Sequence, residues 1–365
     1  MNELNYLLAL LRSVLNGEKP PELPEGLSFG GVLELAKAHS MANMAFYGIE
    51  RLEKKPAEPL LSEWEQIRDK AIVKDINQLS ELEQISTALS ERNIRHLPLK
   101  GSVLKELYPQ SDMRTMADID MLIDEENAAA ARDIMRELGY SCEHFGYDIH
   151  DIYYKQPIMN VEIHRELFGE EGRQFGGIFA EPFSLCEKTE GMRERFTEEY
   201  FLAYVIAHAI KHYSEGGTGI RSFMDIAVYL RAKHADTEKV CGILEPSGCA
   251  DMARDLIGLS RVWFEGAQSS GKYDKMAEYV ISGGTYGTIQ NSVENKVREQ
   301  GKAKYFLRLI FPTFLHMKQH YPVLKKAPVL LPFCWLFRLV TKPIINRKEN
   351  AAKLRALTDI KNEYK

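Results

Sequence analysis

Cysteine is scarce in this sequence, and its few copies form no recognisable pattern. The chain of 365 residues has five cysteines, an odd number, and no two of them are spaced as Cys-x-x-Cys. This spacing excludes a disulfide framework and a zinc ribbon as sources of stability. We therefore expect a protein of the reducing cytoplasm.

An excess of positive charge is also lacking. The formal net charge is −5 at pH 7, so no strong bulk attraction to nucleic acid is expected, and any binding of phosphate must be local. The hydrophobic fraction of 45% and the charged fraction of 27% are those of an ordinary folded protein. The length is sufficient for two domains with sizeable cores.

No segment is long and apolar enough to predict a transmembrane helix. Residues 1–15 contain Glu3 and Arg12 and lack a small-residue cleavage site, so they predict a helix rather than a secretion signal. The most apolar run, residues 327–340, is shorter than the roughly 18 to 20 residues that a span needs. A packing helix is the simpler interpretation. Because lysines and arginines flank this run, a weak peripheral membrane contact through residues 323–347 is the alternative.

Hydrophobic periodicity divides the chain into three regions. We predict a helical region over 1–93, a compact α/β core over 94–195 and a helical domain over 196–365. The predicted helices of the outer regions are 4–15, 30–53, 63–92, 198–213, 220–233, 237–245, 250–264, 274–281 and 287–310. In the core we predict strands at 94–99, 117–123, 140–145, 151–155 and 159–166, with helices at 102–108 and 125–138.

The candidate chemical centre is the pair Asp118 and Asp120. Side chains two residues apart on a strand point to the same face, so the two carboxylates would lie together. Glu162 lies on a later predicted strand and supplies a third carboxylate. Three carboxylates on neighbouring strands suit a site for two magnesium ions, because hard cations prefer oxygen ligands. An isolated Asp-x-Asp also occurs on surface strands without any function.

The turn that contains Lys100, Gly101 and Ser102 is a candidate phosphate cradle. Gly101 permits close backbone approach, and the Ser102 hydroxyl and the free amides of a helix N-terminus suit a triphosphate. A strand-to-helix turn with Ser102 as the N-cap is the simpler interpretation. Lys100 and Arg114 add positive charge on either side of this segment.

Several other polar residues have two interpretations. His164 shares a strand face with Glu162 and suits a phosphate or metal contact, although a hydrogen-bonded core histidine has the same pattern. His208 and His212 have the spacing of zinc ligands on a helix, but no glutamate lies between them to act as the base of a metalloprotease. Arg221 either forms an intrahelical ion pair with Asp225 or faces a cleft and holds substrate, with Asp225 orienting it.

The segment LPLKGSVLKELYPQSDMRTMADIDMLI, over residues 97–123, and the later VEIHREL resemble conserved blocks of a protein family. They look like the central motifs of the bacterial nucleotidyltransferase-like family labelled NTP_transf_5, within the superfamily that includes DNA polymerase beta. The resemblance covers most of the chain from residue 94 onward. It implies an α+β fold, in which a polymerase beta-like core with a mixed sheet is flanked by N-terminal helices and a helical C-terminal domain.

The resemblance also implies roles for individual residues. Asp118, Asp120 and Glu162 would be the catalytic residues and would bind Mg²⁺ or Mn²⁺. Nucleotide contacts would come from Lys100, Gly101, Ser102, Arg114, His164 and Arg221. The expected activity is metal-dependent transfer of a nucleoside monophosphate from an NTP to a hydroxyl of an unidentified small molecule, protein or RNA. The alternative is a nucleotide-binding or protein-interaction module of the same fold with little or no turnover.

Overall fold

Five short strands form a mixed sheet in the order β1-β2-β5-β4-β3. They are β1 (His96–Pro98), β2 (Ile119–Ile123), β3 (Ser141–Cys142), β4 (His150–Lys155) and β5 (Met159–His164). β2 runs parallel to β5, and the other neighbouring pairs are antiparallel. The predicted mixed sheet and α+β class are confirmed. The computed structural model describes residues 2–143, 145–269, 271–321, 323–345, 352–353 and 355–358.

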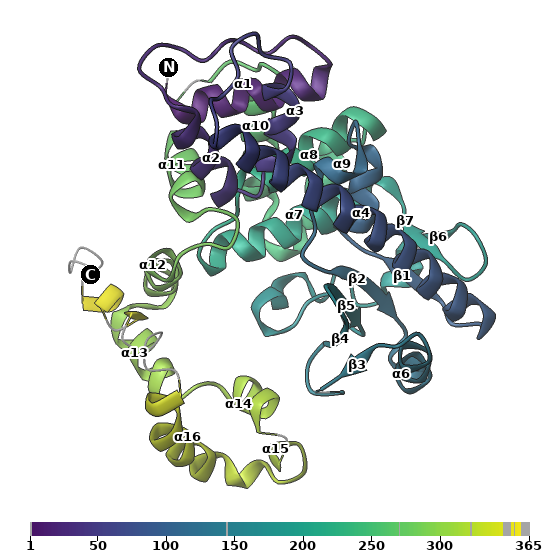
Figure 1. Cartoon of the computed structure of the whole chain (residues 1–365). Helices are drawn as coiled ribbons and strands as arrows, with labels where there is room; N and C mark the ends of the chain where they lie inside the picture. The colour runs from purple at the N-terminus through teal and green to yellow at the C-terminus, as the bar shows by residue number, and fades with distance from the viewer. Residues whose placement is uncertain are drawn as a thin grey trace.

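One face of the sheet is covered by helices, which fixes the direction of its side chains. The covering helices are α4 (Leu60–Glu91) and α6 (Ala128–Glu137), and Figure 1 shows them beside the strands. Ile119, Met121 and Ile123 of β2 pack into the same core cluster as Ile85 of α4 and Ile134 of α6. Because successive side chains of a strand point to opposite faces, Asp120 points to the other face of the sheet.

The N-terminal helices share a core with helices from beyond the sheet. The first group is α1 (Glu3–Asn16), α2 (Phe29–Ala38) and α3 (Ala42–Ile49). The second is α7 (Glu198–Glu215), α8 (Ile220–Lys233), α9 (Thr237–Leu244), α10 (Ala250–Phe264) and α11 (Asp274–Gly283). A single buried cluster includes Leu11 of α1, Phe46 of α3, Ile206 of α7 and Leu256 of α10. The predicted domain boundaries at 93 and 195 stay predictions.

Two predicted helices are divided in the structure. The stretch predicted over 30–53 forms α2 and α3, because Ser40 between them has a left-handed backbone with φ 56°. The stretch predicted over 287–310 forms α12 (Ile289–Gln300) and α13 (Lys302–Ile310), separated at Gly301 with φ 83°. Glycine adopts such angles without steric cost, which makes it a common helix end.

The end of the core region differs from the prediction. The strand predicted over 140–145 is only β3, and a hairpin of β6 (Cys186–Lys188) and β7 (Glu194–Phe196) was not predicted. A parallel bridge between His96 and Arg193 connects this hairpin with β1. Three residues per strand are too few to show alternation in a sequence.

The remaining helices form a C-terminal layer, at the lower left of Figure 1, whose helix α12 contacts α7. They are α14 (Phe314–His320), α15 (Val323–Lys326) and α16 (Leu331–Ile345), together with α12 and α13. Met317, Leu324 and Cys334 form a small buried cluster inside this layer. Among the residues that the structure describes, no helix is long and apolar enough to cross a membrane.

Between the sheet and the helices, the chain from 105 to 114 is anchored by buried polar contacts. It contains the short turns η1 (Lys105–Leu107) and η2 (Ser111–Met113). Lys105 forms a buried ion pair with Asp75 of α4, which also accepts a hydrogen bond of 2.6 Å from Ser111 Oγ. Asp112 accepts hydrogen bonds from Asn43 and Tyr47 of α3. Helices α3 and α4 therefore determine the path of the chain toward Asp118.

Candidate functional site

A cleft of about 410 Å³ lies where the sheet meets α7 and α8. Its lining includes all three predicted carboxylates, Asp118, Asp120 and Glu162. A larger hollow of about 780 Å³ lies between α1, α8 and α10, and the residues that line it include none of these carboxylates. The smaller cleft is the candidate site because the ionisable groups converge there.

Asp120 is the most strongly engaged carboxylate. It lies in β2, opposite Glu162 in the parallel β2–β5 register. Its Oδ1 accepts hydrogen bonds from Lys100 Nζ at 3.0 Å and from His164 Nε2 at 2.9 Å. Burial alone would raise the pKa of Asp120, but the charge of Lys100 and the His164 bond outweigh it and hold the pKa well below its usual range.

The pKa values of the groups that contact Asp120 shift in the opposite direction. Burial lowers the pKa of Lys100, but the charge of Asp120 outweighs this and the pKa is raised. The pKa of His164 is also raised, because its bonds to Asp120 and Glu162 outweigh the effect of burial. Asp120, Lys100 and His164 thus form a charged network that stabilises the ionised carboxylate.

Asp118 lies one residue before β2 and has a different environment. Burial raises the pKa of Asp118 to about 6, and the negative charges of Asp120 and Glu162 act in the same direction. Glu162 itself has a lowered pKa, because its hydrogen bond with His164 outweighs the effect of burial. The three carboxylates thus crowd negative charge at one end of the cleft, and a cation would relieve their repulsion.

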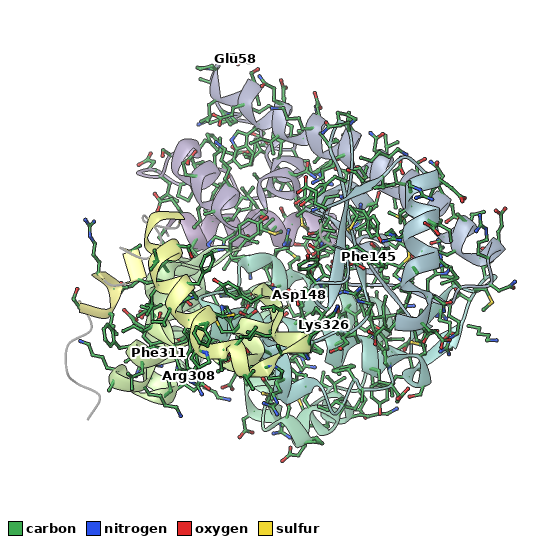
Figure 2. All side chains as sticks on the ribbon, turned by 90° about the horizontal axis from the view of Figure 1, so that it is seen from below. Glu58, Phe145, Asp148, Arg308, Phe311 and Lys326 are labelled. Atoms are coloured by element: carbon green, nitrogen blue, oxygen red, sulfur yellow. The ribbon has the colours of Figure 1, made fainter. Side chains whose placement is uncertain are left out.

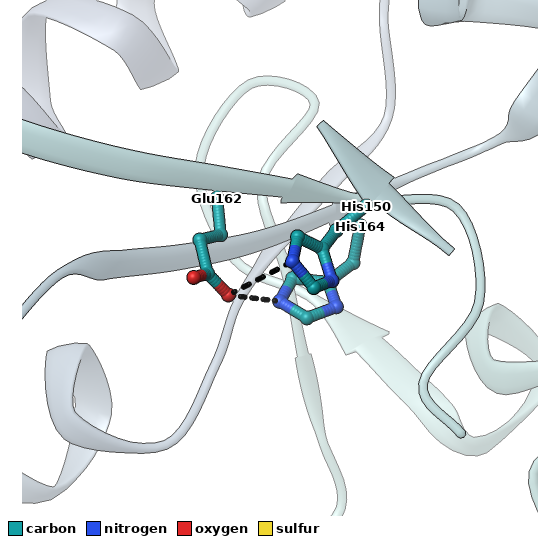
Figure 3. A group of neighbouring side chains, drawn as sticks. All are labelled: His150, Glu162 and His164. Atoms are coloured by element: carbon teal, nitrogen blue, oxygen red, sulfur yellow. Dashed lines mark ion pairs between the residues drawn. The ribbon is translucent and has the colours of Figure 1, made fainter. Parts of the chain in front are cut away.

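A second group of donor atoms shares Glu162. Glu162 Oε2 lies 3.5 Å from His164 Nε2 and 3.7 Å from His150 Nε2, as Figure 3 shows. The ligand atoms of these three residues all lie within 4.8 Å of one another. Two imidazoles and a carboxylate are a donor set for Mn²⁺ or Zn²⁺ more than for Mg²⁺.

Sequence reasoning gave His150 no role in this site. The β4–β5 pairing places it directly opposite His164. The short turn at Gln156 and Pro157 is the feature of the sequence that could have predicted this pairing. A tight hairpin at that turn aligns residue 150 with 164 and residue 155 with 159. The register of the hairpin, rather than the spacing of histidines along the chain, brings the two rings together.

Arg114 and Asp225 form a buried pair that the sequence did not predict. Arg114 Nε and Nη2 donate to the two carboxylate oxygens of Asp225 at 3.1 and 2.8 Å, and Tyr108 Oη donates to Oδ1 at 2.7 Å. Arg114 was predicted to contact nucleotide, and Asp225 was predicted to pair with or orient Arg221. In the structure Asp225 instead pairs with Arg114, the residue that follows η2.

The glycine of the proposed phosphate cradle has a packing role as well. A Cβ on Gly101 would lie 2.3 Å from Arg114 Nη1 and 2.4 Å from the sulfur of Met116. Before it, Lys100 has a left-handed φ of 41°, which is strained for a residue with a side chain. The turn therefore gives Arg114 room and directs the Lys100 ammonium toward Asp120.

Ser102 lies outside this cleft. Its side chain lines a separate hollow of about 230 Å³ and the residue is only 2% exposed. The helix N-cap is Lys100 rather than Ser102, and α5 (Gly101–Leu104) has only four residues. Ser102 is therefore not among the residues that line the cleft with the carboxylates, and its predicted nucleotide contact stays a prediction.

Cationic and imidazole groups line the helical side of the cleft. Arg221 of α8 donates from Nη1 to the Thr115 carbonyl at 3.1 Å, and burial and the neighbouring Arg114 lower its pKa. His208 and His212 of α7 also line the cleft, with their Nε2 atoms 3.3 Å apart. Burial lowers the pKa of both imidazoles, so they are neutral at pH 7. The cleft thus has an acidic end and a cationic side.

The chain is similar to a protein family and to a solved structure. The chain matches none of the curated proteins. Among solved structures, the antibiotic-resistance factor ANT(2'')-Ia, studied in solution, is similar with 16% identity and a TM-score of 0.36. That match covers 49% of this chain and 95% of the other. A family model described as uncharacterised nucleotidyltransferase matches residues 27–265, from before α2 to just after α10, and the chain belongs to this family.

Proposed function

We propose that the protein transfers a nucleoside monophosphate from an NTP to a hydroxyl acceptor, in a reaction that depends on a divalent metal. The observation that carries the proposal is the convergence of Asp118, Asp120 and Glu162 on one cleft, with Asp120 and Glu162 opposite each other on parallel strands. Arg221 lines the same cleft and offers positive charge for phosphate. The family to which the chain belongs supports nucleotidyl transfer in general.

The residues present fit a divalent cation. Their carboxylate oxygens are hard donors, and the raised pKa of Asp118, near 6, reflects burial and repulsion from its neighbours. Asp118, Asp120 and Glu162 would hold Mg²⁺ or Mn²⁺, and the imidazoles of His150 and His164 would favour Mn²⁺. When bound, such an ion supplies charge neutralisation for the phosphates and a template for in-line displacement.

The protein's own groups have separate tasks in this proposal. Arg221 binds phosphate at the helical side of the cleft, and Lys100 places positive charge at the sheet end. Glu162, whose pKa is lowered, is ionised at neutral pH and either completes the metal site or accepts the proton of the attacking hydroxyl. The acceptor oxygen then attacks the α-phosphorus, the bond to the β-phosphate bridging oxygen breaks, and pyrophosphate leaves.

A nucleotide-binding or protein-interaction module with little turnover is the second candidate. It is favoured by the contacts of Asp120, whose Oδ1 bonds to both Lys100 and His164. These internal partners supply the positive charge that a metal ion would otherwise give to this oxygen. Such a module would bind nucleotide at the cleft through the same cations.

Label transfer distinguishes the two candidates. The purified protein is incubated with cell extract, Mg²⁺ or Mn²⁺ and each α-labelled NTP in turn, and labelled products are separated. We expect a labelled acceptor with the wild type and a loss of at least about a hundredfold in Asp118→Asn/Asp120→Asn, because charge neutralisation at the phosphates is the main catalytic contribution. The matched control is Asp124→Asn, which alters a carboxylate at the far end of β2 that pairs with Arg95.

The results of label transfer and nucleotide binding distinguish the two candidate functions. Equal label transfer by the double variant would show that these carboxylates are not the catalytic group. Nucleotide binding by the wild type, measured by calorimetry, without a labelled acceptor in any extract would favour the binding module. Faster transfer with Mn²⁺ than with Mg²⁺ would support participation of the His150 and His164 imidazoles.

A further inference from the structure

Exposed apolar side chains are concentrated in the C-terminal layer. Of seventeen large hydrophobic residues that are exposed among those the structure describes, ten lie between 306 and 340. They are Phe306, Leu307, Phe311, Val323, Val329, Phe333, Leu336, Phe337, Leu339 and Val340. Scattered exposed hydrophobics are normal, but a concentration of this kind indicates an interaction surface.

The exposed apolar side chains of α16 lie together on its outer face. Phe333, Leu336, Phe337 and Val340 follow one another at helical spacing, so they form one stripe, and each is between 61% and 68% exposed. The opposite face of α16 holds the helix against the layer. Trp335 Nε1 donates to the Pro312 carbonyl at 3.0 Å, and Arg338 Nη1 donates to the Leu309 carbonyl at 3.1 Å. The apolar stripe is therefore held outward by specific contacts on the inner side.

Beyond α12, the charge of this layer is of one sign. Residues 301–345 include eight lysines and arginines and no aspartate or glutamate, whereas α12 itself contains Glu294 and Glu299 and the whole chain has a net charge of −5. Lys304, Arg308 and Lys326 are exposed on the helices themselves. Figure 2 shows Arg308 close to Phe311 at one end of the layer, with Lys326 toward the other end. Cations and apolar side chains thus occur together on this layer.

We propose that this layer binds the surface of an anionic lipid bilayer, with the stripe Phe333, Leu336, Phe337 and Val340 entering the headgroup region. Anionic headgroups match the cations, and the boundary with the acyl chains matches the apolar stripe. A nucleic acid would satisfy the charge but would leave the stripe in water. A second copy of this layer would satisfy the stripe but would bring two strongly positive segments together.

The sequence alone left a peripheral membrane contact open as an alternative, and the structure locates the surface that would make it. The sequence indicated residues 323–347 by composition. The structure indicates one face of α16, and it adds Phe306, Leu307 and Phe311 on and just after α13. The family model matches residues 27–265 and does not extend over this layer.

Vesicle flotation tests the proposal with the full-length chain and without nucleotide, so its result is independent of the transfer reaction. We expect the protein to float with vesicles of phosphatidylcholine and phosphatidylglycerol, but not with phosphatidylcholine alone, and to be released by high salt. In Phe333→Ser/Phe337→Ser the partition coefficient should fall at least about tenfold, because two aromatic side chains no longer enter the interface. The matched control is Val73→Ser/Ile76→Ser, which removes two exposed apolar residues of α4 (56% and 62% exposed) and should leave flotation unchanged.

A second variant tests the charge. Lys304→Glu/Arg308→Glu/Lys326→Glu should abolish the preference for anionic vesicles while leaving α16 unaltered, and circular dichroism should show that the fold of each variant is retained. Flotation equally strong with both vesicle types, or unaffected by loss of the two phenylalanines, would overturn the proposal. So would sedimentation showing that the wild type is a dimer and the phenylalanine variant a monomer, because the stripe would then be an interface between copies.

Discussion

Two groups of buried and half-buried charges lie beside the same cleft and differ in how their charge is balanced. Arg114, Asp225 and Tyr108 form a matched set, in which both oxygens of one carboxylate accept bonds from one guanidinium. Asp118, Asp120 and Glu162 form an unmatched set, in which three carboxylates share Lys100 and the histidines. The first group is complete without a ligand, whereas the second still has excess negative charge.

This difference separates positions that hold the fold from positions that are suited to function. A buried ion pair with all its bonds satisfied contributes a fixed geometry, and it is disrupted when one partner is removed. Buried groups of like charge cost stability and shift each other's pKa values, which is common in sites that bind cations or substrates. Three substitutions test this contrast, and they follow from the largest expected effect on stability to the smallest.

Asp225→Asn should have the largest effect. It leaves the buried Arg114 guanidinium without its charged partner and weakens the bond from Tyr108, so we expect the free energy of unfolding to fall by about 3–5 kcal/mol. Urea denaturation measures this change. The control is Asp69→Asn, which alters an exposed ion pair with Arg68 and should change stability by less than about 1 kcal/mol. Equal small losses in the two variants would contradict the contrast.

Gly101→Ala should have an intermediate effect. Its methyl group would press on Arg114 Nη1 and the Met116 sulfur, and we expect a loss of about 1–3 kcal/mol from overpacking. Thermal unfolding provides the measurement. Gly242→Ala in α9 is the matched control, because no atom lies within 4 Å of its added Cβ. That control should be neutral or slightly stabilising, as is usual for alanine in a helix. A loss of the same size in both variants would mean that contact with Arg114 is not the cause.

Asp118→Asn should stabilise the protein, by about 1–2 kcal/mol at pH 7 once solvent screening is included. The folded pKa near 6 is above the ordinary value of 3.8, so the unfolded chain releases this proton first as the pH rises. Stability contributed by this group therefore falls between about pH 4 and 6. Lys74 also faces Asp118, together with Asp120, Glu162 and Lys100.

Denaturation with a chelator present, measured from pH 4 to 8, checks this prediction. The stability of the variant relative to the wild type should increase as the pH rises from about 4 to 6, because the other titrating groups, including the buried His208 and His212, contribute equally to both profiles. Asp251→Asn, an exposed aspartate of α10, is the control and should follow the wild-type profile. A variant that is less stable than the wild type at pH 7 would mean that the Asp118 charge is already balanced in the folded state.

Much of the fold could be predicted because strong local patterns agree with the tertiary structure. The buried run of residues 119–123 predicted a strand, and α4, α6 and α7 have clear helical periodicity, although α4 begins at Leu60 rather than 63 and α6 at Ala128 rather than 125. The placement of Glu162 beside Asp120 was readable only through the family resemblance. Nothing in the local pattern states that β2 and β5 are parallel neighbours.

The contacts between distant segments could not be predicted. Arg114 and Asp225 are 111 residues apart, and neither has a neighbour in the sequence that identifies its partner. Spacing along one helix suggested Arg221 for Asp225, but the fold brings the Arg114 guanidinium, just after η2, to the Asp225 carboxylate. Ser102 likewise looked like part of a phosphate turn, but it lines another hollow and its hydroxyl is buried.

The contacts that anchor residues 105–114 limit which segments of this protein can be exchanged with those of a relative. Asp75 and Asn43 come from helices that precede the sheet, while Asp225 comes from a helix that follows it, and all three hold the approach to Asp118. A chimera that exchanged the sheet region alone with that of a distant relative would separate each of these residues from its partner. An exchange that keeps these contacts together must include at least α3 through α8, so inheritance of the site requires inheritance of the helices on both sides.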